Sequence, residues 1–295
     1  MGGMQTFTLV PRGPFSLVAS IRFLEGFTPA WYSSPADAGL ELAFPVEGSW
    51  RTVGVRVSQA GDEVSATIVS PAEPGADLVA EVRPQVERIL ALDVDCSGFP
   101  AVGERDPVVG ELQRRYPGLR PVGFWSPYEA AAWTIIGHRI RITQAAAIKA
   151  RMAERLGEPV TFGGRVVHAF PSPQRLAGFD TFPGLAGRKP EWLRSLARAA
   201  LDGQLDAARL RAMPPGKALA DLKKLAGIGD FSAGLTLLRG PATSEQVRTI
   251  SENWRPYRTW VTLLLRTQLE YETGEITGRQ GHARQVKLGL ARGCV

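Results

Sequence analysis

The segment Leu225-Ala226-Gly227-Ile228-Gly229 has the residue types and spacing most suggestive of chemistry in this sequence. It follows one short helical pattern and precedes another. Glycine permits a tight turn and leaves no β-carbon between the backbone and an approaching anion. The amides of Gly227 and Gly229 and those of the next helix start could therefore bind a phosphate group. The alternative is an ordinary connection between two helices, for which a Gly-x-Gly turn is common.

The distribution of charge supports an anionic partner. Residues 1–104 hold 6 Arg and no Lys against 13 Asp and Glu, a net charge of −7. Residues 105–295 hold 29 Lys and Arg against 16 Asp and Glu, a net charge of +13. Lys223 and Lys224 lie directly before the glycine turn. This segregation favours a polyanion-binding face in the second part of the chain, although an Arg-rich solvated surface would give the same count.

Other features of the sequence exclude several classes of protein. The 44% of hydrophobic residues can fill real cores, which argues against disorder. No apolar run approaches the roughly 20 residues that a membrane span needs, and the N-terminus lacks the pattern of a secretory signal. Cys96 and Cys294 are the only cysteines and lie far apart, which indicates a reducing compartment and no cysteine metal site. We therefore expect a cytoplasmic protein.

The first hundred residues predict an α+β unit, an antiparallel sheet covered by one helix. Leu78, Val82, Val86 and Ile89 recur at helical spacing and give the helix. Alternating or continuous apolar runs separated by turn residues predict the strands. The expected strands are residues 6–10, 16–24, 39–44, 50–57 and 64–69.

From residue 106 onward the hydrophobic period is that of helices, so the second unit is expected to be all-helical. Ser126-Pro127 and Ser172-Pro173 are typical helix starts, and Thr243 with Gln246 forms a capping pair. A basic tail begins at about residue 279. The expected helices are residues 106–116, 126–140, 143–156, 172–177, 190–201, 216–225, 231–239, 244–254 and 256–272.

Four further motifs lie before and after the glycine turn in the sequence. They are Ala91-Leu92-Asp93, residues 133–140 (WTIIGHRI), residues 170–173 (FPSP) and residues 254–258 (WRPYR). Together they resemble the helix-hairpin-helix superfamily of base-excision DNA glycosylases, nearest to bacterial DNA-3-methyladenine glycosylase II. The resemblance covers most of the chain.

This resemblance implies an α+β N-terminal domain over residues 1–104 and an all-α helix-hairpin-helix glycosylase bundle over residues 105–295. In that family the cleft lies between two helical subdomains. The hairpin, residues 222–231, would grip a DNA phosphate. The DNA-binding residues carried over are Lys223, Lys224, Leu225, Gly227, Ile228, Gly229, His138 and Arg139. No cofactor is expected, but the carbonyls of Lys223, Leu225 and Ile228 could hold a structural Na⁺ or K⁺.

The family enters the minor groove with a wedge and swings the target nucleotide into a pocket. By position the wedge loop is residues 137–140, with Arg139 at its tip. A phosphate-contacting or solvent-facing role for Arg139 and Arg141 is an equal alternative, and His138 would orient the loop or meet a phosphate. Phe231 matches an aromatic residue of the pocket, with a core role as its alternative. Arg266 replaces a second aromatic, where a cation would repel a cationic alkylated base.

The family's catalytic aspartate has no counterpart. It should follow the hairpin's second helix at about 20 residues' remove, where it stabilises the oxocarbenium-like sugar. No Asp occurs after Asp230, and the residues following Gly240 lead directly into the next family helix. Asp230 is expected to cap a helix. Glu245 and Glu252 are the candidates for a substitute acid, and a structural role is the favoured alternative for each.

Three hypotheses remain. The first is a DNA glycosylase that binds double-stranded DNA as a monomer, flips alkylated bases of the 3-methyladenine type and hydrolyses the N-glycosidic bond. The second is a catalytically impaired protein that binds damaged DNA. The third is an incomplete helical bundle, which predicts exposed apolar surface and poor solubility.

Overall fold

The computed structural model describes residues 4–26, 39–69, 78–229 and 251–273. Its first part contains a four-stranded antiparallel sheet in the order β1-β4-β3-β2. Four of the predicted strands are confirmed. Their alternate apolar side chains, such as Val53, Val55 and Val57, are fully buried, as expected for a sheet with one face on the core. The strands are β1 (Gln5–Leu9), β2 (Leu40–Pro45), β3 (Thr52–Ala60) and β4 (Glu63–Val69).

The segment that follows β1, predicted to be a strand, is instead the helix α1 (Leu17–Gly26). The Ser16 hydroxyl accepts a hydrogen bond from the amide of Ala19 at 3.2 Å, which is the contact of an N-cap. Leu17, Ile21 and Leu24 are buried at helical spacing. The prediction was wrong because additional apolar residues between these positions hide the helical period.

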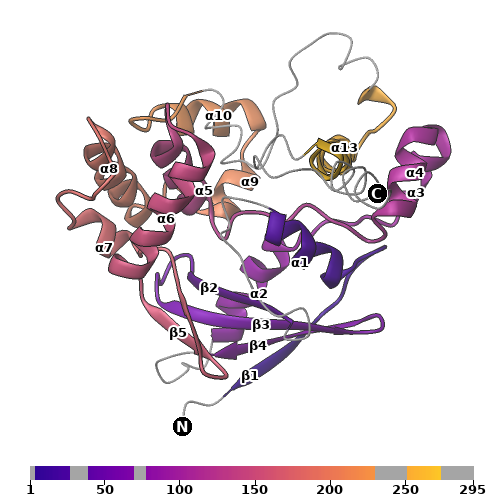
Figure 1. The fold of residues 1–295 in the computed structure, drawn as a ribbon, viewed down its shortest axis with the longest axis horizontal. Coiled ribbons are helices and arrows are strands. Elements are labelled where there is room, and N and C mark those ends of the chain that lie inside the picture. Colours follow the sequence, from indigo (N-terminus) through magenta and orange to yellow (C-terminus); the bar gives the residue numbers. More distant parts are fainter. Residues whose placement is uncertain (1–3, 27–38, 70–77, 230–250, 274–295) are drawn as a thin grey trace, which may run out of the picture.

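Two helices therefore cover one face of the sheet. α1 and α2 (Leu78–Ile89) lie above it in Figure 1, and their buried side chains share one apolar core with all four strands. The helices between residues 127 and 223 lie on one side of this layer, and a smaller helical group from residues 100–115 and 258–273 lies on the other side (Figure 1).

The opposite face of the sheet is covered by a β-hairpin that the sequence analysis did not predict. Its strands are β5 (Pro159–Phe162) and β6 (Arg165–His168), paired in antiparallel fashion. Gly163 and Gly164 form the two-residue loop with φ of 54° and 93°, which few other residues adopt. Residues 105–295 are thus not all-helical. The short alternation between helices 143–156 and 172–177, centred on Gly-Gly, was the overlooked signal.

Most of the predicted helices are present, within a few residues of their expected bounds. Ser126 caps α5 by accepting from the Glu129 amide at 3.1 Å, and Ser172 caps α7 by accepting from the Arg175 amide. The predicted helices at 231–239 and most of 244–254, with the Thr243–Gln246 pair and the tail from 279, lie outside the described residues. The helices of this group are α5 (Pro127–Gly137), α6 (Ile142–Leu156), α7 (Pro173–Ala177), α8 (Lys189–Leu201), α9 (Ala207–Ala212) and α10 (Pro215–Lys223).

The remaining helices form a separate apolar core. α3 (Pro100–Arg105), α4 (Pro107–Arg115) and α13 (Arg258–Thr273) pack around Phe99, whose ring lies 5.3 Å from those of both Tyr257 and Trp260. α3 and α9 were not predicted. The division of the chain at residue 104 stays a prediction. Within the described ranges no helix is long and apolar enough to cross a membrane.

One buried cation joins distant parts of the chain. The Arg120 side chain is fully buried. Its guanidinium donates hydrogen bonds at 2.8–3.4 Å to carbonyls of residues that precede β3 in the sequence and of residues that follow α2. A buried guanidinium is tolerated where its donors find acceptors. Its acceptors are the carbonyls of Arg12, Gly13, Pro14, Ala91 and Val94.

Candidate nucleic-acid interface

The glycine turn begins where α10 ends. The Leu225 amide donates to the Leu222 carbonyl at 3.1 Å, and the Ile228 amide donates to the Leu225 carbonyl at 3.1 Å. These two bonds reverse the chain within a few residues. Ile228 is 6% exposed and belongs to the apolar core of α5, α6 and α8. Its burial therefore anchors the turn to the helical body, while the second helix of the predicted hairpin lies outside the described residues.

The structure requires glycine at one of the two glycine positions of the turn but not at the other. Gly227 has φ of +83°, and a β-carbon there would lie 2.8 Å from Cε3 of Trp192, so the fold itself requires glycine. Gly229 is exposed and its φ lies outside the left-handed region. No described atom lies within 4 Å of a β-carbon built at Gly229. The described fold therefore gives no reason for glycine at 229.

Both predicted lysines lie at the surface beside the turn. Lys223 and Lys224 are exposed, and the Lys224 ammonium pairs with a carboxylate oxygen of Asp221 at 2.8 Å. The hydrogen bond from Lys224 and the charge of Arg209 help to hold the pKa of Asp221 below its ordinary value, with the Lys224 contribution the larger. An exposed pair of this kind contributes little to stability, so Lys224 can exchange Asp221 for another anion.

The predicted wedge loop connects α5 to α6. His138 and Arg139 are exposed, and Arg139 has φ of 57°, a conformation that costs most residues roughly 1–2 kcal/mol. Arg141, also exposed, is the residue before α6. The loop thus presents two arginine side chains and an imidazole to solvent, and its role as a wedge stays a prediction.

Trp192, which the sequence analysis did not single out, lies between the turn and the wedge loop. Its ring is in contact with Gly227 and lies 6.0 Å from the His138 ring, centroid to centroid. On α8 the buried stripe runs through Leu193, Leu196 and Ala200, so Trp192 lies at the edge of that stripe. A large aromatic residue in such a position was the available signal, but only the tertiary structure shows what it contacts.

Lys189 fixes α8 to the helix that leads into the wedge loop. It is 8% exposed, and its ammonium donates to the Ile136 carbonyl in the last turn of α5 at 2.9 Å. Burial lowers the pKa of Lys189. Because the carbonyls at a helix C-terminus lack intrahelical partners, this contact satisfies one of them immediately before His138.

The predicted base-recognition residues are only partly described. Arg266 is exposed on α13, whereas Phe231 lies outside the described residues. Of the substitute acids, Asp230 and Glu245 also lie outside them. Glu252 is held by Arg255 at 2.5 Å and by Arg258. Side-chain hydrogen bonds, first that of Arg255, lower the pKa of Glu252. Its carboxylate is thus occupied by a local ion-pair cluster.

The C-terminal motif of residues 254–258 is structural where it is described. The Trp254 indole donates to Asp106 Oδ2 at 2.8 Å, and the Tyr257 hydroxyl donates to the Asp95 carbonyl at 2.9 Å. Both contacts join the start of α13 to the segments around α3. The described residues of this motif therefore hold two parts of the fold together.

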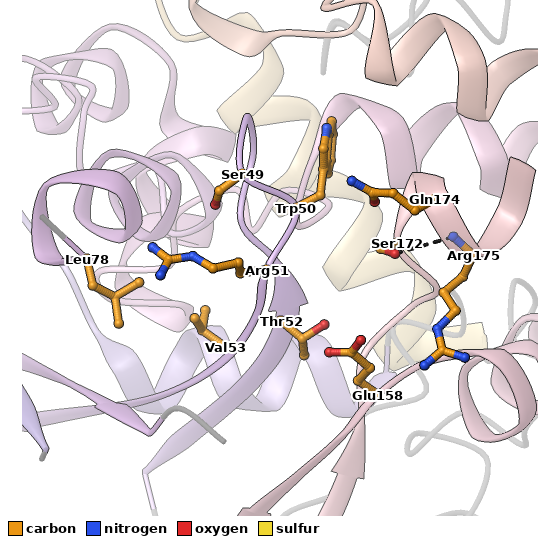
Figure 2. Close-up of a pocket in the computed structure, with 10 residues that line it drawn as sticks. All are labelled: Ser49, Trp50, Arg51, Thr52, Val53, Leu78, Glu158, Ser172, Gln174 and Arg175. Carbon is orange, nitrogen blue, oxygen red and sulfur yellow. Dashed lines mark hydrogen bonds between the residues drawn. The ribbon is translucent and has the colours of Figure 1, made fainter. Parts of the chain in front are cut away.

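A cavity of about 480 Å³ opens between the turn that connects β2 to β3 and the start of α7 (Figure 2). Trp50 borders it with φ of 55° and packs edge-on against Tyr128 at 5.6 Å. Arg51 on the same side pairs with Glu81 at 3.2 Å. The described residues around this cavity include none that the sequence predicted for DNA binding, so it is distinct from the interface.

Comparison with known proteins finds DNA glycosylases among the relatives of this chain. DNA-3-methyladenine glycosylase 2 of Escherichia coli (strain K12) is 30% identical over 212 residues, 63% of this chain and 71% of that protein. DNA-3-methyladenine glycosylase of Bacillus subtilis (strain 168) is 28% identical over 164 residues, and the match spans 54% of each chain, about half. No family model matches the chain.

Among solved structures, the 3-methyladenine DNA-glycosylase from Archaeoglobus fulgidus superposes with a TM-score of 0.66. That match is 20% identical and covers 88% of this chain and 97% of the other. The relative at 30% identity, together with this shared fold, defines the class as that of the DNA glycosylases. The chain belongs to the helix-hairpin-helix base-excision superfamily of these proteins and within it lies near bacterial DNA-3-methyladenine glycosylase II.

Proposed function

We propose that this protein binds duplex DNA as a monomer and flips alkylated bases of the 3-methyladenine type for N-glycosidic hydrolysis. The observation that supports the proposal is that the glycine turn and the wedge loop both lie next to the same indole ring, that of Trp192. A duplex whose phosphate lies at the turn would then have its groove beside Arg139. The names of the relatives support the choice of alkylated purines.

In this proposal the exposed backbone at Gly229 approaches a phosphate. Glycine is not required there by the described fold, and a β-carbon would occupy the space into which a phosphate oxygen would come. The ammonium groups of Lys223 and Lys224 add attraction that depends on salt concentration. His138 and Arg139 would contact the backbone or enter the minor groove.

A monovalent cation at the turn is part of the proposal. Its ligands would be the main-chain carbonyls of Lys223, Leu225 and Ile228. The donor chemistry fits, because neutral carbonyl oxygens suit hard cations and the Leu225 carbonyl keeps a lone pair beyond the one that accepts from Ile228. A bound Na⁺ or K⁺ would supply positive charge next to the phosphate.

Base recognition would involve Phe231 and Arg266. Phe231 would stack on a flipped base, and an alkylated purine would gain cation–π attraction from it. Arg266 carries a positive charge that would oppose a cationic base and favour a neutral one. The ratio of cationic to neutral lesions bound by Arg266→Ala, compared with the unaltered protein, tests this assignment.

A second candidate function, recognition of damaged DNA without hydrolysis, is favoured by a specific observation. No Asp occurs between residues 231 and 295 of the sequence, and Glu252 is held by Arg255 and Arg258. Losing an electrostatic contributor of this kind typically costs several kcal/mol of transition-state stabilisation. Cationic purines need the least assistance because their leaving group is already charged.

The experiment that separates the two functions combines binding and release. Duplex DNA carrying an abasic-site analogue measures binding, and methylated DNA measures release of 3-methyladenine and 7-methylguanine. Binding with release above the spontaneous rate supports the glycosylase. Binding without release, even at high protein concentration, supports the second candidate.

Substitutions at the turn test the interface itself. Gly229→Asp should abolish DNA binding while the circular dichroism spectrum stays unchanged, because it places a carboxylate where the phosphate would lie. Gly229→Ala should weaken binding less. Asp202→Ala, at the exposed C-terminus of α8, serves as a control that removes a carboxylate elsewhere. Unchanged affinity of Gly229→Asp would refute the assignment.

A further inference from the structure

The Trp192 indole is bounded by residues from three separate segments. Cε3 and Cδ2 of its ring lie 2.8 and 2.9 Å from the position of a β-carbon at Gly227. The His138 ring, on the wedge loop, is 6.0 Å away and inclined at 58°. The guanidinium of Arg188, the residue that precedes α8, lies over the indole at 5.8 Å from the ring centroid. The indole is therefore a neighbour of both the glycine turn and the wedge loop.

The helix that carries Trp192 is fixed at both of these segments. Lys189 donates to the Ile136 carbonyl at 2.9 Å, at the end of the helix that leads into the wedge loop. Leu193, the next residue after Trp192, is fully buried in the same core as Ile228 of the turn. Arg188 is oriented by a two-pronged contact with Glu191 at 3.0 and 3.1 Å. Trp192 thus has little freedom to move.

Although Ile228 anchors the turn, the residues of the two segments nearest to the indole are weakly supported. His138 and Arg139 are exposed, and Arg139 is held in a left-handed conformation. Gly227 has no side chain, and its neighbour Ala226 is exposed. A rigid aromatic ring between them can set their separation, because packed interiors resist compression.

We infer that Trp192 is a positioning residue that fixes the distance between the phosphate-binding turn and the wedge loop. As a result, the turn binds a phosphate and the wedge loop enters the groove at the same time. This inference rests on the proposed function. Trp192 need not touch the target base. Its effect is exerted through Gly227 and His138, and it would determine how well the protein distinguishes distorted from regular duplex.

The role predicts a differential effect. Phosphate contacts at the turn and lysines remain without the indole, so affinity for undamaged duplex should change little. Insertion of the wedge depends on placement, and an error of about 1 Å at a reacting group can cost roughly 100-fold. Loss of the indole should therefore lower lesion preference far more than it lowers general affinity.

The test compares Trp192→Ala, Trp192→Phe and Leu201→Ala, the last being an exposed apolar position on the same helix. Fluorescence anisotropy gives the affinity for undamaged duplex and for duplex with an abasic-site analogue. A 2-aminopurine beside the lesion reports unstacking. We expect Trp192→Ala to lose at least 10-fold in lesion preference with less than a 3-fold loss on undamaged DNA. Trp192→Phe should recover most of the preference, and Leu201→Ala should behave as the unaltered protein.

Hydrogen exchange in the free protein tests the same link without DNA. The amides of Ile228 and His138 donate to the Leu225 and Ile135 carbonyls, one in each segment. Trp192→Ala should accelerate exchange of both, whereas Leu201→Ala should accelerate neither. Acceleration confined to one amide would overturn the inference, because the indole would then support only one segment.

The DNA measurements separate this inference from the function on which it rests. A folded Trp192→Ala that keeps its lesion preference, or that loses affinity for both duplexes equally, would overturn the positioning role alone. Absence of duplex binding by the unaltered protein would overturn the proposed function, and the DNA role of Trp192 with it.

Discussion

The two glycines of the turn should respond oppositely to the same substitution. In Gly227→Ala, φ of +83° costs roughly 1–2 kcal/mol, and overlap with the Trp192 ring at 2.8 Å adds roughly 1–3 kcal/mol. The turn should therefore lose about 2–5 kcal/mol of local stability. Gly229→Ala meets no described atom within 4 Å and has no left-handed φ. Its cost should be near zero, or a gain of about 0.4–1 kcal/mol from the restricted unfolded chain.

Hydrogen exchange at the Ile228 amide is the appropriate assay, because its bond to the Leu225 carbonyl closes the turn. A loss of 2–5 kcal/mol corresponds to faster exchange by a factor between about 30 and several thousand, with global unfolding as the upper limit. Global denaturation alone is less suitable, since several separate cores need not unfold in one step.

The double substitution Gly227→Ala/Trp192→Ala separates the two contributions at Gly227. With the indole removed, adding the methyl group should cost only the roughly 1–2 kcal/mol of the left-handed conformation. Equal exchange rates in Gly227→Ala and Gly229→Ala would refute the reasoning. So would an unchanged cost of Gly227→Ala in the absence of Trp192.

Three further outcomes follow from buried groups. Arg120→Met should lose at least about 3–5 kcal/mol in urea denaturation, since five carbonyls lose a donor. Burial raises the pKa of Glu47 from 4.5 to about 7, against the opposing charge of Arg88. The folded state then holds more protons, so the unfolding free energy should fall by up to about 3 kcal/mol between pH 4.5 and 7, and Glu47→Gln should remove that slope. Lys189→Met should accelerate exchange at the His138 amide by roughly 5- to 100-fold, because the Ile136 carbonyl loses its donor.

The sequence predicted the elements whose signals are local. Ser126 and Ser172 mark helix starts that the structure confirms, because a capping hydroxyl and a following proline act within one turn. The predictions failed where an apolar run fits both the helical and the strand period, as from Ser16 to Leu24, or where a helix or strand is short. The β5–β6 hairpin has four residues in each strand and depends on packing at Gly54, where a side chain would collide with Val160 and Phe162.

The candidate site shows the same division between local and tertiary information. Sequence reasoning assigned a tight turn and the approach of an anion to both glycines. The φ of +83° at Gly227 agrees with the turn, and the structure adds a close approach to an aromatic ring 35 residues earlier in the chain. No pattern near residue 192 indicates that contact. The predicted lysines and the wedge loop lie at the surface as expected, since solvated charges on turns need no distant partner.

The proposed DNA binding can be tested separately from the proposed hydrolysis, because the described contacts that hold the turn all precede residue 230. Ile228 is buried in the core of α5, α6 and α8, Trp192 supports Gly227, and Lys189 fixes α8 to α5. None of these contacts uses the segment in which the family's acid would lie. If the turn contacts a phosphate as proposed, its geometry therefore does not depend on the residues after Gly240. The same independence predicts that introducing an Asp after Gly240 would change the rate of base release without changing duplex affinity.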